Sequence, residues 1–306
     1  MRLILTSMSI LICGMPALLN AAERSQADRD YDLGVEVGEC IAAKCEIFRG
    51  SLPAALPKPG ESVRLLVSET LLGPPTKGAL IDVPYEAYPE VFSGGQNLAL
   101  ANAWSDIKMV GGLPVTVIMA LGDGFGVRAG EPVWVVADGR DAEIVRSLAI
   151  EAAAINAAPA LLDQAVASLA SAPNYALAGY LFMYAASTLT TEAHEQGAGA
   201  LVRMLATAST PPGRSEPVVR FIVLDYSRLS GQSQVDVARG LTECTRQADV
   251  RKQLAAFGGL ARIAGFDKSV NLPPVPASLR DAYRTLVKSG GTPRNGELEA
   301  ALGIKQ

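Results

Sequence analysis

The sequence has few of the residues that usually carry catalysis or metal binding. His194 is the single histidine in 306 residues, so the His-Glu-x-x-His pair of a zinc protease is missing. The four cysteines form no Cys-x-x-Cys, which disfavours a thioredoxin-type redox site. Charged residues make up only 19% of the chain, and the formal net charge of −4 excludes a chain-wide basic surface for nucleic acid. We therefore expect no nucleic acid partner, no metal and no cofactor.

Residues 1–22 have the pattern of an export signal. Arg2 precedes a series of apolar residues that ends in the small pair Ala21-Ala22, and charge returns at Glu23. A basic start, a short apolar stretch and small residues before a polar sequence are what a signal peptidase recognises. The stretch is too interrupted for a membrane span of about 20 residues. We expect an exported protein, periplasmic or extracellular, with an uncleaved N-terminal anchor as the alternative.

Three cysteines follow the predicted cleavage site, namely Cys40, Cys45 and Cys244. In an oxidising compartment, Cys40 and Cys45 are the candidate disulfide pair, which would close a small loop. The odd count leaves one thiol over.

Residues 23–140 are predicted to form a small all-β domain, a barrel or a sandwich. From about Val35 to Val136, short runs rich in Val, Ile and Leu are bounded by Gly and Pro. Residues 86–112, which hold Trp104, are the least regular part and are predicted to be a long surface loop. The predicted strands are residues 45–52, 62–71, 79–84, 114–121 and 132–137.

Residues 141–306 are predicted to be all-α, which gives an α+β fold class. A displacement of 40 residues places residues 181–184 on 221–224 and Ala160-Leu161 on Ala200-Leu201. A period near ~40 residues fits stacked helical hairpins of the HEAT or armadillo type, and a plain bundle is the alternative. The uncharged run at residues 175–189 is short for a membrane span, so we expect a buried helix there.

Candidate catalytic residues are sparse. His194 has no Gly-x-Ser-x-Gly elbow to accompany it, and an exposed histidine at the start of a helix is the simpler interpretation. Three carboxylates, Glu86, Glu90 and Asp106, share the predicted loop with Trp104. Paired carboxylates hydrolyse glycosides when the fold brings them to the required separation. An exported hydrolase that acts near Trp104 is therefore an alternative function.

A basic helix is predicted near the C-terminus. Arg280, Arg284 and Lys288 recur every four residues, so they share one helical face. Between residues 239 and 294, ten basic residues stand against four acidic ones. Such a face is suited to an acidic partner or to anionic headgroups, and a solvated helix face is the simpler interpretation.

The first half resembles netrin-like, tissue-inhibitor-like OB domains, and the second half resembles HEAT-type repeats in its period alone. The resemblance implies a five-stranded OB-like domain. It does not carry over metalloprotease inhibition, because that activity uses a cysteine at the mature N-terminus and Cys40 lies well inside the chain. The motifs of the OB-like resemblance are Cys40 through Cys45 running into Glu46-Ile47-Phe48-Arg49-Gly50, then Leu71-Leu72-Gly73-Pro74-Pro75 and Ile81-Asp82-Val83-Pro84.

These observations favour an exported, non-enzymatic binding protein, in which a β domain precedes a helical array that presents a binding face. We expect a protein partner or an envelope component, with docking to a membrane surface through the basic helix as a further alternative. The candidate binding residues are Arg280, Arg284, Lys288 and Trp104.

Overall fold

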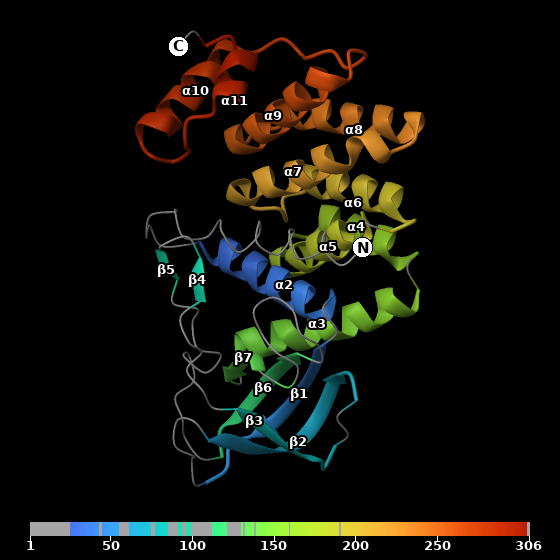
Figure 1. Ribbon diagram of the computed structural model, residues 1–306, viewed down its shortest axis with the longest axis vertical. Coiled ribbons are helices and arrows are strands. Elements are labelled where there is room, and N and C mark those ends of the chain that lie inside the picture. The colour runs from blue at the N-terminus through green and yellow to red at the C-terminus, as the bar shows by residue number, and fades with distance from the viewer. Residues whose placement is uncertain are drawn as a thin grey trace. The chain divides into compact units, whose positions relative to one another are not determined.

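A computed structural model gives the fold of the chain (Figure 1). It describes residues 25–42, 45–54, 61–74, 77–84, 91–93, 96–98, 112–120, 130, 132–137, 139–158, 160–189 and 191–304. The protein is α+β, as predicted, and its contacts define two compact units. The sheet unit includes Glu39–Ala158, and the helical unit combines Gln26–Gly38 with Pro159–Gln306. The sheet unit is therefore inserted into the sequence of the helical unit, and the division differs from the predicted boundary at residue 140.

Five strands form one antiparallel sheet in the order β3-β2-β1-β6-β7. All five overlap the strands predicted from short apolar runs bounded by Gly and Pro. A separate two-stranded ribbon contains β4 (Val91–Ser93) and β5 (Gln96–Leu98). The strands of the large sheet are β1 (Cys45–Ser51), β2 (Ser62–Leu72), β3 (Leu80–Pro84), β6 (Pro114–Ala120) and β7 (Pro132–Ala137).

One face of this sheet carries the main core of the unit. Along β2, buried and exposed residues alternate, so Val63, Leu65 and Val67 point to the same face. Phe48 of β1 lies opposite Val117 of β6, and both side chains belong to the same core as these β2 residues. The complete cluster contains Phe48, Leu52, Val63, Leu65, Val67, Val83, Val115, Val117, Met119 and Val135.

Helix α3 (Arg140–Ala157) covers the other face. Its Arg146 donates a hydrogen bond of 2.9 Å to Glu69 of β2, and Glu69 also lies 3.7 Å from Arg49 of β1. Ile47 and Ile118 are buried on this side of the sheet. Both faces are therefore apolar near the centre, which explains the nearly continuous apolar run in β6.

Of the two predicted forms, a barrel or a sandwich, a closed barrel is not what the described strands form. The strand order leaves β3 and β7 as the two edges of an open sheet, since the described residues show no pairing between them. Alternation along single strands predicts which residues face a core, but it does not specify whether the two edge strands pair. A helix packed on one face of an open sheet buries apolar surface, as closing the sheet into a barrel would.

The helical unit consists of hairpins that stack in two layers (Figure 1). Helix α6 contacts both α4 and α8, whereas α7 contacts α9, so α4, α6 and α8 share one layer. The second layer contains α5, α7 and α9. The helices are α2 (Gln26–Ala42), α4 (Leu161–Ser171), α5 (Tyr175–Thr188), α6 (His194–Ala206), α7 (Ser215–Asp225), α8 (Gly231–Cys244), α9 (Val250–Phe266), α10 (Ala277–Lys288) and α11 (Gly296–Ala301).

Hydrogen bonds between successive hairpins follow the period seen in the sequence. Arg203 donates to Asp163, and the Ser209 hydroxyl donates to the Leu169 carbonyl, in both cases across 40 residues. The Tyr226 hydroxyl donates to Asp267 across 41 residues at 2.9 Å. The 40-residue displacement therefore corresponds to the step from one hairpin to the next. The apolar helix α5 is buried at the start of this stack, as predicted.

Helix α2 belongs with these hairpins although it precedes the sheet in the chain. A Cβ atom at Gly34 of α2 would overlap the carbonyl oxygen of Ala176 of α5. A Cβ atom at Gly179 would likewise overlap the carbonyl oxygen of Tyr31. The two helix backbones thus touch at a point that only glycine allows. The prediction of β structure from Val35 is accordingly wrong as far as residue 42.

The C-terminal helices α10 and α11 pack on α9 through a small core of their own. Phe257 of α9 is 1% exposed and lies at its centre. The cluster contains Leu254, Phe257, Leu279, Tyr283 and Leu302. Because these residues come from three adjacent elements only, the cluster ties the end of the chain to α9 and to little else.

Candidate functional site

Several predicted site residues lie outside the described residues. Trp104 is one of them, so its binding role stays a prediction, and the loop carboxylates Glu86, Glu90 and Asp106 are others. The side chain of Cys40 is not described either. Cys45 is a buried free thiol in the structure, and its pairing with Cys40 stays a prediction.

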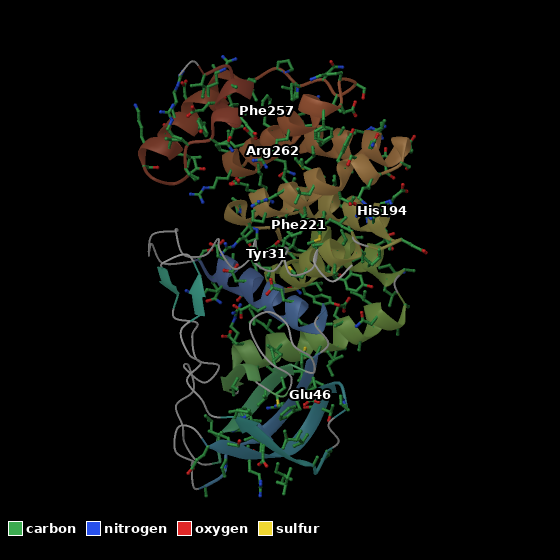
Figure 2. All side chains as sticks on the ribbon, in the orientation of Figure 1. Tyr31, Glu46, His194, Phe221, Phe257 and Arg262 are labelled. Carbon is green, nitrogen blue, oxygen red and sulfur yellow. The ribbon has the colours of Figure 1, made fainter. Side chains whose placement is uncertain are left out.

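His194 lies near a buried carboxylate at one end of the helices, apart from Phe221 and Arg262 (Figure 2). Its Nδ1 is 3.1 Å from the carbonyl oxygen of Thr191. Asp225 is 5% exposed, and its Oδ1 accepts a hydrogen bond of 2.9 Å from Arg228. Burial raises the pKa of Asp225, whereas the positive charges of Arg228 and His194 lower it. The histidine is therefore half-buried within a polar cluster, which sequence alone does not reveal.

This cluster joins two connections of the array. Arg228 also donates to the carbonyl oxygen of Leu189, at 2.8 Å, so it links the end of α7 to the end of α5. Glu195 accepts a hydrogen bond of 2.9 Å from the backbone N–H of Ser230, which begins α8. In the described residues, no group of three or more His, Cys, Asp or Glu side chains is arranged to hold a metal ion. The hydrogen bonds of Arg228 and Glu195 therefore hold adjacent hairpins together.

At the C-terminal end of α6, a buried lysine of α9 also binds backbone carbonyl groups of a neighbouring helix. Lys252 donates through Nζ to the carbonyl oxygens of Thr207 and Leu205, which end that helix. Burial lowers the pKa of Lys252 and raises the pKa of the nearby Cys244 thiol to about 11. A positive charge at a helix C-terminus is favourable, so Lys252 caps α6. The Cys244 thiol is a poor nucleophile in this setting.

The predicted basic helix is α10, and its three basic residues have different surroundings. Arg280 donates to the carbonyl oxygen of Leu302 at 2.7 Å, and Arg284 lies 3.1 Å from Asp281 on its own helix. Lys288 is exposed in the last turn. Other basic residues of this region are paired too, as Arg262 is with Glu297 and Arg294 with Glu299. The binding role of the α10 face stays a prediction.

A better-defined surface runs along α7 and α9, in the layer that also contains α5. Gly259 of α9 faces Val219 and Val223 of α7, and Gly213, just before α7, lies beside Arg251 of α9. These contacts fix the register of the two helices. The outer sides of α7 and α9, turned away from their packed sides, form what we name the α7–α9 face. It contains Glu216, Pro217, Arg220 and Leu224 of α7 and Arg251, Ala255, Gly258, Arg262 and Phe266 of α9.

The α7–α9 face combines exposed apolar side chains with arginines. Leu224 is 66% exposed and Phe266 is 55% exposed, although both are large apolar residues. Arg220 and Arg251 form no ion pair within the part of the chain that the structure describes. Exposed apolar side chains beside arginine are characteristic of binding surfaces. Sequence analysis missed this face because its residues come together only when two hairpins stack.

Glu39 gives a prediction about the pH dependence of stability. Burial raises the pKa of this α2 carboxyl to about 7 from an ordinary value of 4.5. Because the folded state holds the proton more tightly, the stabilising contribution is complete below pH 4.5 and is lost as the pH rises towards 7. We expect Glu39→Gln to match wild type at pH 4.5 and to exceed it by about 3 kcal/mol at pH 8, measured by urea denaturation.

The matched control for Glu39→Gln is Glu243→Gln, which changes an exposed carboxyl on α8. A Glu39→Gln variant whose stability relative to wild type is the same at both pH values would contradict the burial of the Glu39 carboxyl.

Comparisons with known proteins found no matching family model, no matching curated protein and no matching solved structure. Among the described residues, no helix has both the length and the apolar character that a membrane crossing requires.

Proposed function

We propose that this chain is an exported, non-enzymatic binding protein whose helical unit holds a protein partner or an envelope component on the α7–α9 face. The observation that supports the proposal is the exposure of Leu224 and Phe266 on a surface built from two stacked hairpins. Stacked hairpins form a rigid support with an extended face, which suits binding more than chemistry.

The finer features of the fold belong to the same proposal. The helical hairpins are of the HEAT-like kind, because hydrogen bonds between successive hairpins join residues that are 39 to 41 positions apart in the sequence. The sheet unit is an OB-like domain, an inference supported by five antiparallel strands in a partly open arrangement. Export rests on the pattern of residues 1–22, and it predicts a mature chain that starts near Glu23.

The binding proposal is tested by affinity capture from an envelope fraction with three baits. The baits are the mature wild-type chain, a Leu224→Asp variant and a Val235→Asp variant. Val235 is the matched control, because it is 52% exposed but lies on α8 in the other layer. We expect one specific partner that wild type and Val235→Asp retain and that Leu224→Asp loses. Equal recovery with all three baits would contradict the proposal.

The non-enzymatic part of the proposal has its own test. The mature chain is offered a broad panel of hydrolase substrates, including glycosides. We expect no turnover above background. Turnover that disappears in a His194→Ala variant, or on changing one of the loop carboxylates, would show an enzyme instead.

A further inference from the structure

We propose that residues 272–276 are a preformed polyproline II ligand, and that they bind a partner domain whose groove is lined with aromatic side chains. The segment has the sequence Leu-Pro-Pro-Val-Pro and connects α9 to α10 (Figure 1). None of its residues belongs to the α7–α9 face, so this inference goes beyond the proposed function and adds a second binding surface.

The first step is the backbone conformation of the segment. A proline ring fixes its own φ at about −65°, and it keeps the preceding residue out of the α region. Pro273, Pro274 and Pro276 therefore restrict all five residues. Pro276 has φ −62° and ψ 142°, which are polyproline II values. Within the part of the chain that the structure describes, residues 271–275 make no backbone–backbone hydrogen bond, as is typical of this conformation.

The second step is the exposure of the segment. Polyproline II has three residues per turn, so side chains three positions apart share an edge. One edge holds Leu272 and Val275, and Val275 packs on the cluster that joins α10 and α11 to α9. A second edge holds the half-buried Pro273 and the exposed Pro276, and the third holds the exposed Pro274. The Pro-x-x-Pro pair and the remaining proline are therefore on the two edges that a partner can reach.

The third step is that both ends of the segment are held in place. Before it, the Tyr226 hydroxyl donates to Asp267 at 2.9 Å, and Lys268 donates to two of the last carbonyl groups of α9. At its end, the carbonyl oxygen of Pro276 accepts a hydrogen bond of 3.1 Å from the backbone N–H of Leu279 in α10. A ligand that is already fixed in its bound conformation loses little entropy on binding.

The fourth step is the chemistry that the partner must offer. No charged residue occurs between Lys268 and Arg280, and Leu272 is 39% exposed beside the prolines. Such a segment offers apolar surface and carbonyl groups and no ion pairs. The aromatic-lined grooves of SH3, WW and EVH1 domains recognise proline-rich segments of this kind. The partner is therefore a domain with a groove of this class.

The experiment measures binding of the mature chain to three immobilised probes, an SH3, a WW and an EVH1 domain, by surface plasmon resonance. The variant P273A/P276A removes both rings of one edge, and P274A removes the ring of the other. The control P212A/P217A also removes one exposed and one half-buried proline, before and within α7. Circular dichroism and thermal melting check that the variants fold. If P273A/P276A does not fold, P274A decides the test, because Pro274 is exposed.

We expect at least one probe domain to bind the mature chain, and an excess of that domain's own proline-rich peptide to displace it. P273A/P276A should bind at least about tenfold more weakly than wild type, P274A about threefold more weakly, and the control within about twofold. No saturable binding to any of the three domains, equal binding by both double variants, or binding that the peptide does not displace would overturn the inference. Binding that Leu224→Asp abolishes and P273A/P276A retains would place the contact on the α7–α9 face and would also overturn it.

Discussion

Replacing Gly179 by alanine is expected to destabilise the protein by about 3 kcal/mol, in spite of the higher helix propensity of alanine. The new methyl group would overlap the carbonyl oxygen of Tyr31 in α2. Backbone atoms cannot turn aside as a flexible side chain can, so the two helices must move apart and lose their contact. Equilibrium unfolding in urea measures the change, and a similar loss is expected for Gly34→Ala because its methyl would overlap the Ala176 carbonyl.

The control is a second helical glycine, Gly265 of α9, which has no heavy atom within 4 Å of the position of a Cβ. Gly265→Ala is expected to stabilise the protein by about 0.5–1 kcal/mol, because alanine loses less backbone entropy in a helix. The two substitutions are chemically identical and differ in the sign of their expected effect. If both stabilised the protein, α2 would not lie against α5.

Replacing Phe257 by alanine is expected to release the C-terminal helices from the rest of the helical unit. This ring is 1% exposed at the centre of the small cluster that joins α10 and α11 to α9. Removing a buried phenylalanine costs about 3–5 kcal/mol, and here the loss falls on the cluster that holds α10 and α11 against α9. Hydrogen exchange should show loss of protection over residues 277–301, while α6 and α7 keep theirs.

Phe266→Ala is the matched control for this experiment. The same side chain is removed from the same helix, but Phe266 is 55% exposed. We expect little change in stability and no loss of protection at α10. Loss of protection throughout the helical unit in Phe257→Ala would show that the C-terminal cluster is part of the main core.

The sequence predicts the strands and the hairpin period well, because both depend on local patterns. In β2 the alternation of Val63, Leu65 and Val67 is enough to place a strand, and the 40-residue displacement marks equivalent positions in the hairpins. Residues 31–38 are harder to predict from the sequence. Leu33, Val35 and Val37 alternate as in a strand, whereas the buried set Tyr31, Gly34 and Gly38 follows a helical period. A glycine that is buried for close packing gives no apolar signal.

The candidate site was less predictable, for a physical reason. Four-residue spacing correctly places Arg280, Arg284 and Lys288 on one helix, but the bond from Arg280 to the Leu302 carbonyl depends on the turn between α10 and α11. In the same way, Arg251 approaches α7 only because two hairpins stack in one register. Contacts between residues far apart in the sequence are set by packing, and hydrophobic periodicity does not encode them.

Helix α2, although it precedes the sheet in the chain, completes the helical unit on which the proposed binding face is built. Native-state hydrogen exchange on the mature chain tests it most directly, because it gives an opening free energy for each helix. We predict the same opening free energy for the amides of residues 27–38 as for those of α5. Exchange of residues 27–38 at the rate of an unprotected chain, while α5 stays protected, would contradict the account.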